Sequence, residues 1–376
     1  MRKRHFLGLM ALPPALWAFH RLRHGPPEPL NPLQSLLSGE AEAGFARVLG
    51  PEPFMFPRDH AAHPDYRHEW WYFTGNLLSP ENDAFGFQLT FFRFAIAASA
   101  RPSASAWNTR QAMLGHFALT DVNQRRFHAA QRLDRPALGI AGMQDTPARV
   151  WIRDWQAHHV ATLPEVWELE ARGPGYGLKL ALTTTKAWVE QGQGGYSRKG
   201  PGRSNASRYY SGTRLAAAGE VTVEGTPMRV AGLAWLDREW GTSALAPGTR
   251  GWDWFGLQLD DGSDLMVYLL RQEDGSPSEF SAGSHVSGTG SVVALAAPDL
   301  AMEVLETWTS PHSKRHYPAR WRLRIDSLGL DLRIMPRVAD QEWEGLVRYW
   351  EGCVRVEGTR AGKKLQGLGY AELTGY

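Results

Sequence analysis

The sequence predicts an all-β protein, and three observations support this fold class. Its 376 residues include 16 Trp, 39 Gly and 24 Pro, and aromatic residues suit pleated sheets whereas Gly and Pro mark turns. Most of the chain beyond residue 50 alternates with a period of two residues. The alternating segments recur about every 8–14 residues with Gly, Asp and Asn between them, which is typical of sandwiches and barrels.

The length indicates two domains, on a prior of roughly 100–200 residues per domain. Hydrophobic residues make up 43% and charged residues 21% of the chain, which are the values of a globular protein that can bury a core. Residues 245–250, which include Pro247 and Gly248, are typical of a joint between domains. We therefore predict an N-terminal domain over residues 50–245 and a C-terminal domain over residues 246–376.

The first 30 residues have the layout of an export signal. Basic residues 2–4 precede an apolar run over residues 6–19, and a polar flank follows. The run is too short to span a bilayer as a helix, which needs roughly 20 residues. Residues 3–7 resemble a twin-arginine signal with lysine in place of the first arginine. The segment predicts a periplasmic or cell-envelope protein, with a cleaved leader or an N-terminal membrane tether; a frayed terminus with incidental basic residues is the alternative.

Beyond a Pro-rich linker we expect one short helix over residues 33–49, and then strands. The strands expected in the first domain cover residues 68–77, 84–96, 113–122, 149–155, 167–170, 178–184, 209–215, 220–223 and 228–235. Those expected in the second domain cover residues 251–259, 264–272, 291–295, 303–308, 319–325, 330–336, 349–358 and 367–376. Residues 191–206, rich in Gly and Ser, predict a mobile loop.

Charge and cysteine content exclude several classes of function. The chain has 41 Lys+Arg against 39 Asp+Glu, a formal net charge of +2, and no basic tail, so we predict no nucleic-acid partner. The single cysteine, Cys353, rules out an intramolecular disulfide and a Cys-based zinc site. A buried thiol is the expected state of this residue.

Three segments place carboxyl groups among aromatic rings, at residues 68–72, 235–240 and 252–254. An indole ring removes water from a carboxyl group, which raises its pKa and lets it donate a proton near neutrality. Such a group could protonate a C=C bond or polarise a carbonyl, while the aromatic faces stabilise a developing cation. We take Asp237, Glu239 and His68 as candidate acids and bases.

Structural roles compete with these catalytic roles. Residues 237–239 precede a predicted turn, where alternating charges commonly form a solvated ion-pair cluster, and tryptophan stripes are more often core than pocket. His68 would equally serve as a structural histidine between strands. On a regular strand His68 and Glu69 point to opposite faces and cannot ligate one ion. The neighbours His158 and His159 diverge in the same way, so we predict no metal site and no cofactor.

Four stretches together resemble one known family: HEWWYFTGNL (68–77), YYSGTRL (209–215), AWLDREWGTSAL (234–245) and GWDWFGLQLDDGSDLMVYLLR (251–271). They are similar to the family that groups the carotenoid 1,2-hydratases with AttH-like exported proteins, over about residues 50–376. The resemblance implies two lipocalin-like β-barrels packed together, with an apolar cavity at or near their interface. The ligand-binding residues that it implies are Trp70, Trp71, Tyr72, Tyr210, Trp235, Trp240, Trp252, Asp253 and Trp254.

The resemblance also bears on catalysis. The hydratases of this family add water across a terminal isoprenoid double bond without a cofactor, at a site that resembles H-x-W followed by Y-x-D. The matching positions here are Arg238-Glu239-Trp240 and Tyr268-Leu269-Leu270. Trp240 and Tyr268 match, whereas the histidine and the acid do not. Tyr268 thus becomes a fourth candidate catalytic residue, and the proton donor would move to Asp237, Glu239 or Asp253.

Two functions stay open. The first is an exported protein that binds an apolar small molecule, a lipid or an isoprenoid, between its barrels, with an ABC transporter permease as partner. The second is a hydratase, isomerase or hydrolase that acts on an apolar substrate by acid catalysis. A structural envelope protein that docks a partner is a weaker third interpretation. The export segment and the replaced acid favour binding over hydration.

Overall fold

The computed structural model describes residues 44–98, 109–160, 163–243 and 245–376. The export segment expected over residues 1–30 lies outside this part of the chain, as does most of the helix expected over residues 33–49. Residues 44–49, which are described, are not helical. Among the described residues, no helix combines the length and the hydropathy that a membrane span requires.

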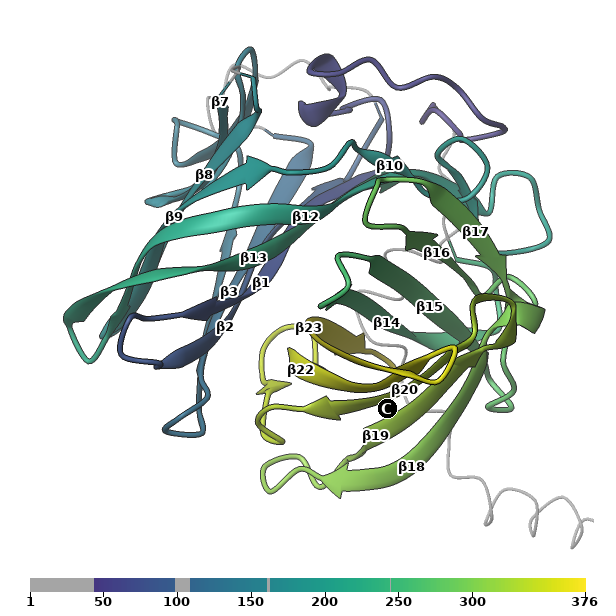
Figure 1. Cartoon of the computed structure of the whole chain (residues 1–376). Helices are drawn as coiled ribbons and strands as arrows, with labels where there is room; N and C mark the ends of the chain where they lie inside the picture. The colour runs from purple at the N-terminus through teal and green to yellow at the C-terminus, as the bar shows by residue number, and fades with distance from the viewer. Residues whose placement is uncertain (1–43, 99–108, 161–162, 244) are drawn as a thin grey trace, which may run out of the picture.

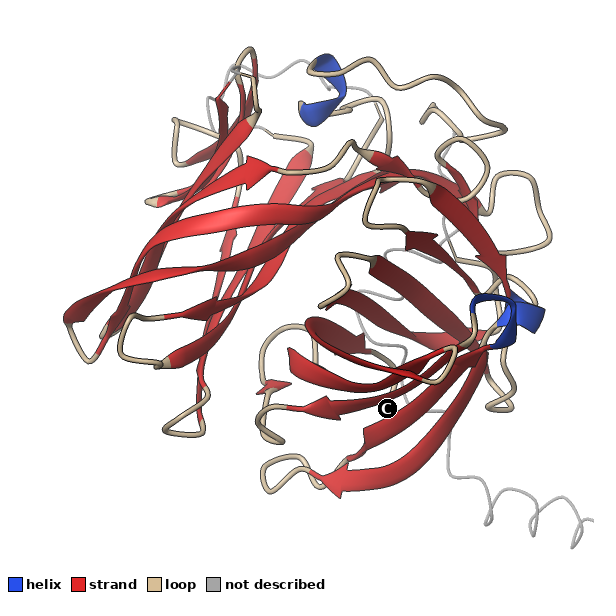
Figure 2. Ribbon diagram, viewed as in Figure 1, coloured by secondary structure: helices blue, strands red, loops and turns tan. Residues whose placement is uncertain are grey.

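The fold is built almost entirely from strands, in two antiparallel sheets that each curl toward a barrel (Figure 1). Figure 2 shows that, within the part of the chain that the structure describes, helix is confined to short turns, namely η1 (Arg58–His60), η2 (Ala297–Asp299) and η3 (Asp326–Leu328). The predicted all-β class with two lipocalin-like barrels is confirmed. The chain passes from one sheet to the other between Gly241 and Thr249.

The first sheet has the strand order β4-β3-β2-β1-β13-β12-β9-β8-β7-β6-β5, with β10 and β11 paired to β12. Its strands are β1 (His68–Leu78), β2 (Ala84–Ala95), β3 (Gln111–Asp121), β4 (Arg126–Asp134), β5 (Ala141–Asp145), β6 (Ala148–Ile152), β7 (Trp155–Val160), β8 (Val166–Gly173), β9 (Tyr176–Thr184), β10 (Val189–Glu190), β11 (Tyr196–Arg198), β12 (Ala206–Val223) and β13 (Thr226–Gly241).

The second sheet has the order β17-β16-β15-β14-β23-β22-β20-β19-β18, with β21 paired to β22. Its strands are β14 (Thr249–Leu259), β15 (Asp264–Gln272), β16 (Ala282–Val286), β17 (Val292–Ala296), β18 (Ala301–Thr309), β19 (His316–Ile325), β20 (Leu330–Pro336), β21 (Glu342–Trp343), β22 (Tyr349–Arg360) and β23 (Lys363–Leu373).

Several strands differ from those expected, for local reasons. The segments expected at 209–215 and 220–223 form one long strand, β12, because the small residues 216–219 continue the ladder with β13 although they carry no aromatic signal. The expected loop over 191–206 contains β11, which also pairs with β12. The strands β4, β5, β10, β16 and β21 were not expected, and the segment expected at 149–155 is divided between β6 and β7. In β4 most side chains are partly or fully exposed, so its apolar alternation is weak.

Buried side chains form three layers. One core fills the inside of the first sheet and contains Trp71 and Phe73; a second fills the inside of the second sheet. The third lies between the sheets and contains Tyr72 and Trp254. Because side chains alternate along a strand, β1 serves two layers at once, with Trp71 and Phe73 on one face and Tyr72 on the other. The first barrel is therefore a packed core, and space for a ligand has to lie elsewhere.

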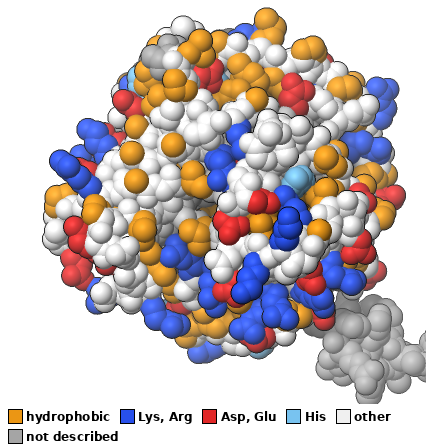
Figure 3. Space-filling view, viewed as in Figure 1, with side chains coloured by type: hydrophobic (Ala, Val, Ile, Leu, Met, Phe, Trp, Pro, Cys, Tyr) orange, Lys and Arg blue, Asp and Glu red, His pale blue; other side chains and the backbone are white. Residues whose placement is uncertain are grey.

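The two sheets meet where β1 and β2 face β23 and β22. The contact is close at Gly86 of β2, where an added Cβ would lie 2.6 Å from the Cβ of Cys353. Asn76 donates a hydrogen bond of 3.0 Å from its Nδ2 to the carbonyl of Gly369. Cys353 is buried, as expected. Figure 3 shows that basic and acidic side chains are interspersed on this face of the molecule, in keeping with the near-neutral net charge.

Candidate functional site

A cavity of about 80 Å³ lies between the two sheets. It is lined by Trp70, Tyr72, Phe92, Lys199, Tyr209, Asp237, Glu239, Leu245, Trp252, Trp254, Tyr268, Leu270, Tyr349, Glu351 and Glu372. The walls come from β1, β2, β12 and β13 on one side and from β14, β15, β22 and β23 on the other. Aromatic rings thus enclose four carboxyl groups, and each sheet supplies two of them.

Asp237 is a buried carboxyl group held by three hydrogen bonds. Its Oδ2 accepts a hydrogen bond of 2.6 Å from the hydroxyl of Tyr209. Its Oδ1 accepts hydrogen bonds from Ser211 Oγ at 2.5 Å and from Trp235 Nε1 at 2.7 Å. Burial raises the pKa of Asp237 to about 7 although these three donors lower it. The group is therefore fixed in orientation and can gain or lose a proton near neutral pH.

Glu351 and Glu372 form a second acidic group on the opposite wall. Glu351 on β22 and Glu372 on β23 lie directly opposite each other as cross-strand neighbours. Burial, and then the neighbouring Glu372, raises the pKa of Glu351 well above its usual value. Burial, followed by the charges of Asp237 and Glu239, raises the pKa of Glu372 to about 8. Because two close carboxylates in an apolar cavity cannot both ionise cheaply, the pair retains a proton at neutral pH.

Glu239, by contrast, has a cationic partner. Lys199 Nζ forms an ion pair with Glu239 Oε1, and Ser207 Oγ donates to the same oxygen at 2.5 Å. Lys199 Nζ also lies 5.6 Å from the ring centroid of Tyr268. Tyr268 in turn contacts Ser197, with 3.3 Å between the two hydroxyl oxygens. Glu239 is thus held in an ion pair with Lys199. Asp237 and the Glu351–Glu372 pair, whose pKa values are raised, are the groups suited to proton transfer.

These pKa shifts predict how stability depends on pH. The pKa of Glu372 rises from 4.5 to about 8 on folding, so between these values the folded state binds more protons than the unfolded state. Stability is therefore greatest below about pH 4.5 for this group and falls as the pH rises toward 8. We expect Glu372→Gln to raise the free energy of unfolding at pH 8 by about 3 kcal/mol, with little effect at pH 5.

Urea denaturation at pH 5 and pH 8 measures this difference. Glu357→Gln is the matched control, because Glu357 lies on β22 but its side chain is 52% exposed; it should leave the pH dependence unchanged. Equal stability of Glu372→Gln and wild type at pH 8 would show that Glu372 ionises normally in the folded protein.

The cavity brings together seven of the residues singled out from the sequence. Of the catalytic candidates, Asp237, Glu239 and Tyr268 line it; of the ligand-binding candidates, Trp70, Tyr72, Trp252 and Trp254 do. Trp235 lies behind the wall and donates to Asp237. The interpretation of residues 237–239 as a solvated turn is wrong, because all three residues lie buried within β13.

The other candidates lie outside the lining. Trp71 belongs to the core of the first sheet, and Tyr210 contacts His60 Nδ1 with its hydroxyl at 2.7 Å. Trp240 stacks on His63, with ring centroids 3.6 Å apart.

His68 and Asp253 are also separate from the cavity. His68 is fully buried against Trp70, and burial followed by the charge of Arg93 lowers its pKa to about 3, which suits a structural role. Asp253 accepts a hydrogen bond from Tyr376 at 2.8 Å and lies 3.3 Å from Arg271.

The sequence analysis missed five polar residues of the cavity, namely Lys199, Tyr209, Tyr349, Glu351 and Glu372. Glu351 and Glu372 each lie near aromatic residues in an expected strand, in YWEG and YAEL. The pattern that singled out Asp237, a carboxyl group beside aromatic residues, is therefore present at these two positions too. Tyr209 belongs to the recognised stretch YYSGTRL. Lys199 falls in the expected mobile loop, and no local pattern could have placed it.

A second hollow, of about 740 Å³, lies over strands β7, β8, β9, β12 and β13 of the first sheet. Charged side chains line much of it, including Glu168, Glu170, Lys179, Glu220 and Arg229. Such a lining suits water and ions rather than an apolar ligand. The cavity between the sheets is therefore the better candidate for apolar chemistry.

Fold and cavity together define a class of protein: two curled antiparallel sheets whose interface holds carboxyl groups in an aromatic enclosure. The chain belongs to the AttH-like family, whose model matches residues 47–376. The crystal structure of a putative AttH from Nitrosomonas europaea is similar with a TM-score of 0.79 and 33% sequence identity. The similarity covers 88% of this chain and all of that one.

Curated relatives carry hydratase and dehydratase names. A kievitone hydratase of Fusarium solani subsp. phaseoli is 28% identical over 143 residues, which are 37% of this chain and 39% of the relative. The dehydratase asqC of Emericella nidulans is 24% identical over 152 residues, or 38% of this chain and 42% of the relative. The match thus spans about two fifths of either relative. The crystal structure of kievitone hydratase from Nectria haematococca shares the fold, with a TM-score of 0.67, 14% identity and coverage of 90% and 98% of the two chains.

Proposed function

We propose that this protein is a hydratase or dehydratase, which adds water to, or removes it from, an apolar substrate held between the two sheets. The observation that carries the proposal is the position of Asp237 opposite Glu372 in one aromatic cavity, with pKa values of about 7 and 8. Two carboxyl groups that titrate at or just above neutral pH can each hold or release a proton there, so together they can supply both the acid and the base of such a reaction.

The roles follow from these environments. In the hydration direction, the Glu351–Glu372 pair donates a proton to one carbon of a C=C bond. Water attacks the adjacent carbon, and the Asp237 carboxylate accepts the proton that the water loses, so one water is added and no proton is gained or lost overall. The faces of Trp70 and Trp254 stabilise the carbocation between the two steps. Dehydration is the same sequence in reverse.

Cavity size favours this function over that of a carrier. Sites that enclose a whole drug-sized ligand have volumes of about 300–1,000 Å³, whereas the cavity here has about 80 Å³. A volume of this size suits the reacting end of a substrate rather than a whole drug-sized ligand. The hydratase and dehydratase names of the curated relatives point the same way, so the comparisons favour the second of the two functions left open by the sequence.

Isotope labelling tests the proposal directly. The full chain would be incubated in H₂¹⁸O with prenylated phenols that bear a trisubstituted terminal double bond, and separately with the corresponding tertiary alcohols. We expect the mass of one labelled water to appear in the alkene samples, or the alcohols to lose water. Absence of turnover throughout both series, together with a stoichiometric lipid that copurifies unchanged in native mass spectrometry, would instead establish a carrier.

The periplasmic location, the membrane tether and the permease partner remain predictions from the sequence. They are compatible with an envelope enzyme that receives an apolar substrate from the membrane.

A further inference from the structure

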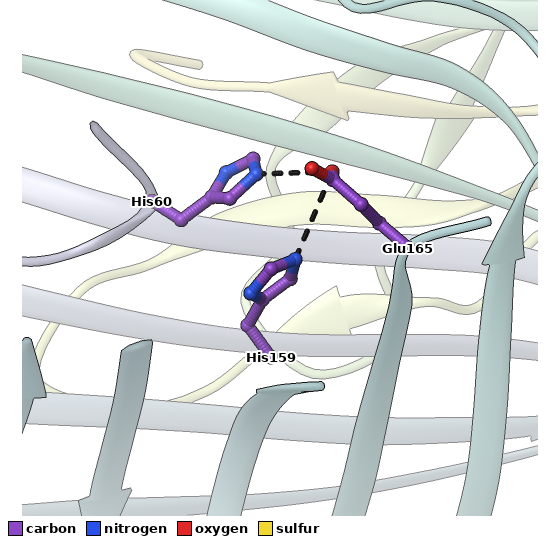
Figure 4. Close-up of side chains that lie close together, drawn as sticks. All are labelled: His60, His159 and Glu165. Carbon is purple, nitrogen blue, oxygen red and sulfur yellow. Dashed lines mark hydrogen bonds and ion pairs between the residues drawn. The ribbon is translucent and has the colours of Figure 1, made fainter. Parts of the chain in front are cut away.

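Three potential metal ligands converge at one end of the first sheet (Figure 4). His60 comes from η1, His159 from β7, and Glu165 directly precedes β8. His60 Nε2 lies 3.2 Å from Glu165 Oε2, and His159 Nε2 lies 3.7 Å from the same oxygen. All three donor atoms lie within 4.8 Å of one another. Ligands of a tetrahedral zinc ion, at 2.0–2.2 Å from the metal, are about 3.3–3.6 Å apart, so small side-chain movements would complete such a site.

The histidines are in a state that suits metal binding. Their side chains are 0% and 2% exposed, and both imidazoles lie against the ring of Trp167. The buried Nε2 of His159 has no hydrogen-bond partner among the described residues. A buried nitrogen without a partner is costly, and a cation between the three groups would satisfy it.

The surroundings orient the ligands as a metal site requires. The hydroxyl of Tyr210 lies 2.7 Å from His60 Nδ1, and as an acceptor there it would leave Nε2 free for a metal. Trp188 Nε1 donates to Glu165 Oε2 at 3.0 Å. Such outer hydrogen bonds fix the tautomer and the direction of metal ligands. Glu165 remains 18% exposed, so the cluster opens to solvent at the carboxylate.

We propose that His60, His159 and Glu165 bind a divalent transition-metal ion, zinc being the best match, with a solvent molecule as fourth ligand. Two neutral imidazoles and one carboxylate are a known zinc ligand set, and this set leaves one coordination position open. None of the three residues lines the cavity between the sheets, so the site is distinct from the proposed hydratase centre. A bound ion would join the segment before β1 to the end of β7. The prediction of no metal site, made from the sequence, did not foresee this cluster.

Direct titration tests this site without any substrate. The full chain, first treated with a chelator, would be titrated with Zn²⁺ by calorimetry and with Co²⁺ by absorption spectroscopy. We expect one ion per chain, visible Co²⁺ bands of tetrahedral intensity, and affinity at least about 100-fold lower in His159→Ala and in Glu165→Gln. His158→Ala is the matched control, because it changes the neighbouring half-buried histidine on the same strand, and it should bind as wild type does.

Two results would overturn the proposal. One is the lack of a Zn²⁺ or Co²⁺ complex at micromolar protein; the other is binding that survives unchanged in both ligand variants, which would place the ion elsewhere. If circular dichroism shows that His159→Ala does not fold, the Glu165→Gln variant decides alone, because its partly exposed side chain tolerates the isosteric change. Labelled-water turnover plays no part in these measurements, so either proposal can fail without the other.

Discussion

Asp237→Asn should reduce the turnover number for hydration by about 10²–10⁴, the usual contribution of a general base or acid. The amide keeps the shape of the side chain but cannot accept the proton of the attacking water. Steady-state kinetics with a substrate identified by the labelling experiment measure the loss, which should appear in kcat more than in KM, since the cavity keeps its shape.

The stability of the same variant provides an internal check. Removing a carboxylate whose pKa is raised to about 7 removes an unfavourable buried charge at pH 8, so we expect Asp237→Asn to be at least as stable there as wild type. Asp253→Asn is the control for chemistry, because Asp253 is also a buried acid in a Trp-rich segment but does not line the cavity. It should keep normal kcat. If Asp237→Asn retained full activity, the acid–base role would have to pass to Glu239 or to the glutamate pair alone.

Glu69→Gln should lower the free energy of unfolding by about 3–5 kcal/mol, the typical effect of breaking a buried ion pair. Glu69 is fully buried and pairs with both Arg93 and Arg238, whose side chains are buried as well. Its oxygens also accept the backbone N–H of His63 at 3.1 and 3.0 Å. Desolvation opposes ionisation, yet these cationic partners hold the pKa of Glu69 well below its usual range, so the group is charged at all ordinary pH values. The variant would leave two guanidinium groups buried without their counter-charge.

Urea denaturation at pH 7 measures this loss. The comparison variant is Glu306→Gln, whose partner Arg320 and own side chain are 41% and 55% exposed, and which should cost no more than about 1 kcal/mol. A small effect at Glu69 would mean that water reaches the arginines in the folded state. Because its carboxylate is already committed to two arginines, Glu69 is a structural residue.

The location of the cavity has a mechanistic consequence. The interior of the first barrel is filled by large side chains such as Trp71 and Trp167, so the chemistry cannot occur inside that barrel. Placing the acids on two sheets separates them: Asp237 lies on β13, while Glu351 and Glu372 lie on β22 and β23. A substrate between the sheets can thus meet the acid on one side and the base on the other, as addition of water across a double bond requires.

By itself, the sequence determined the fold class and part of both walls of the site. Alternation with period two, Gly-rich turns and Trp-rich strands are local properties, so the two faces of β1 and the acid–aromatic character of Asp237, beside Trp235 on its own strand, could be predicted from neighbouring residues. Only the tertiary structure decided that Glu351 and Glu372 lie side by side on neighbouring strands, that Lys199 pairs with Glu239, and that Glu69 pairs with two arginines. It also decided that His60, His159 and Glu165, which lie up to 105 positions apart, meet at one end of a sheet. These contacts depend on strand register and on the packing of one sheet against the other, and both are set by the burial of the whole core rather than by any short stretch of sequence.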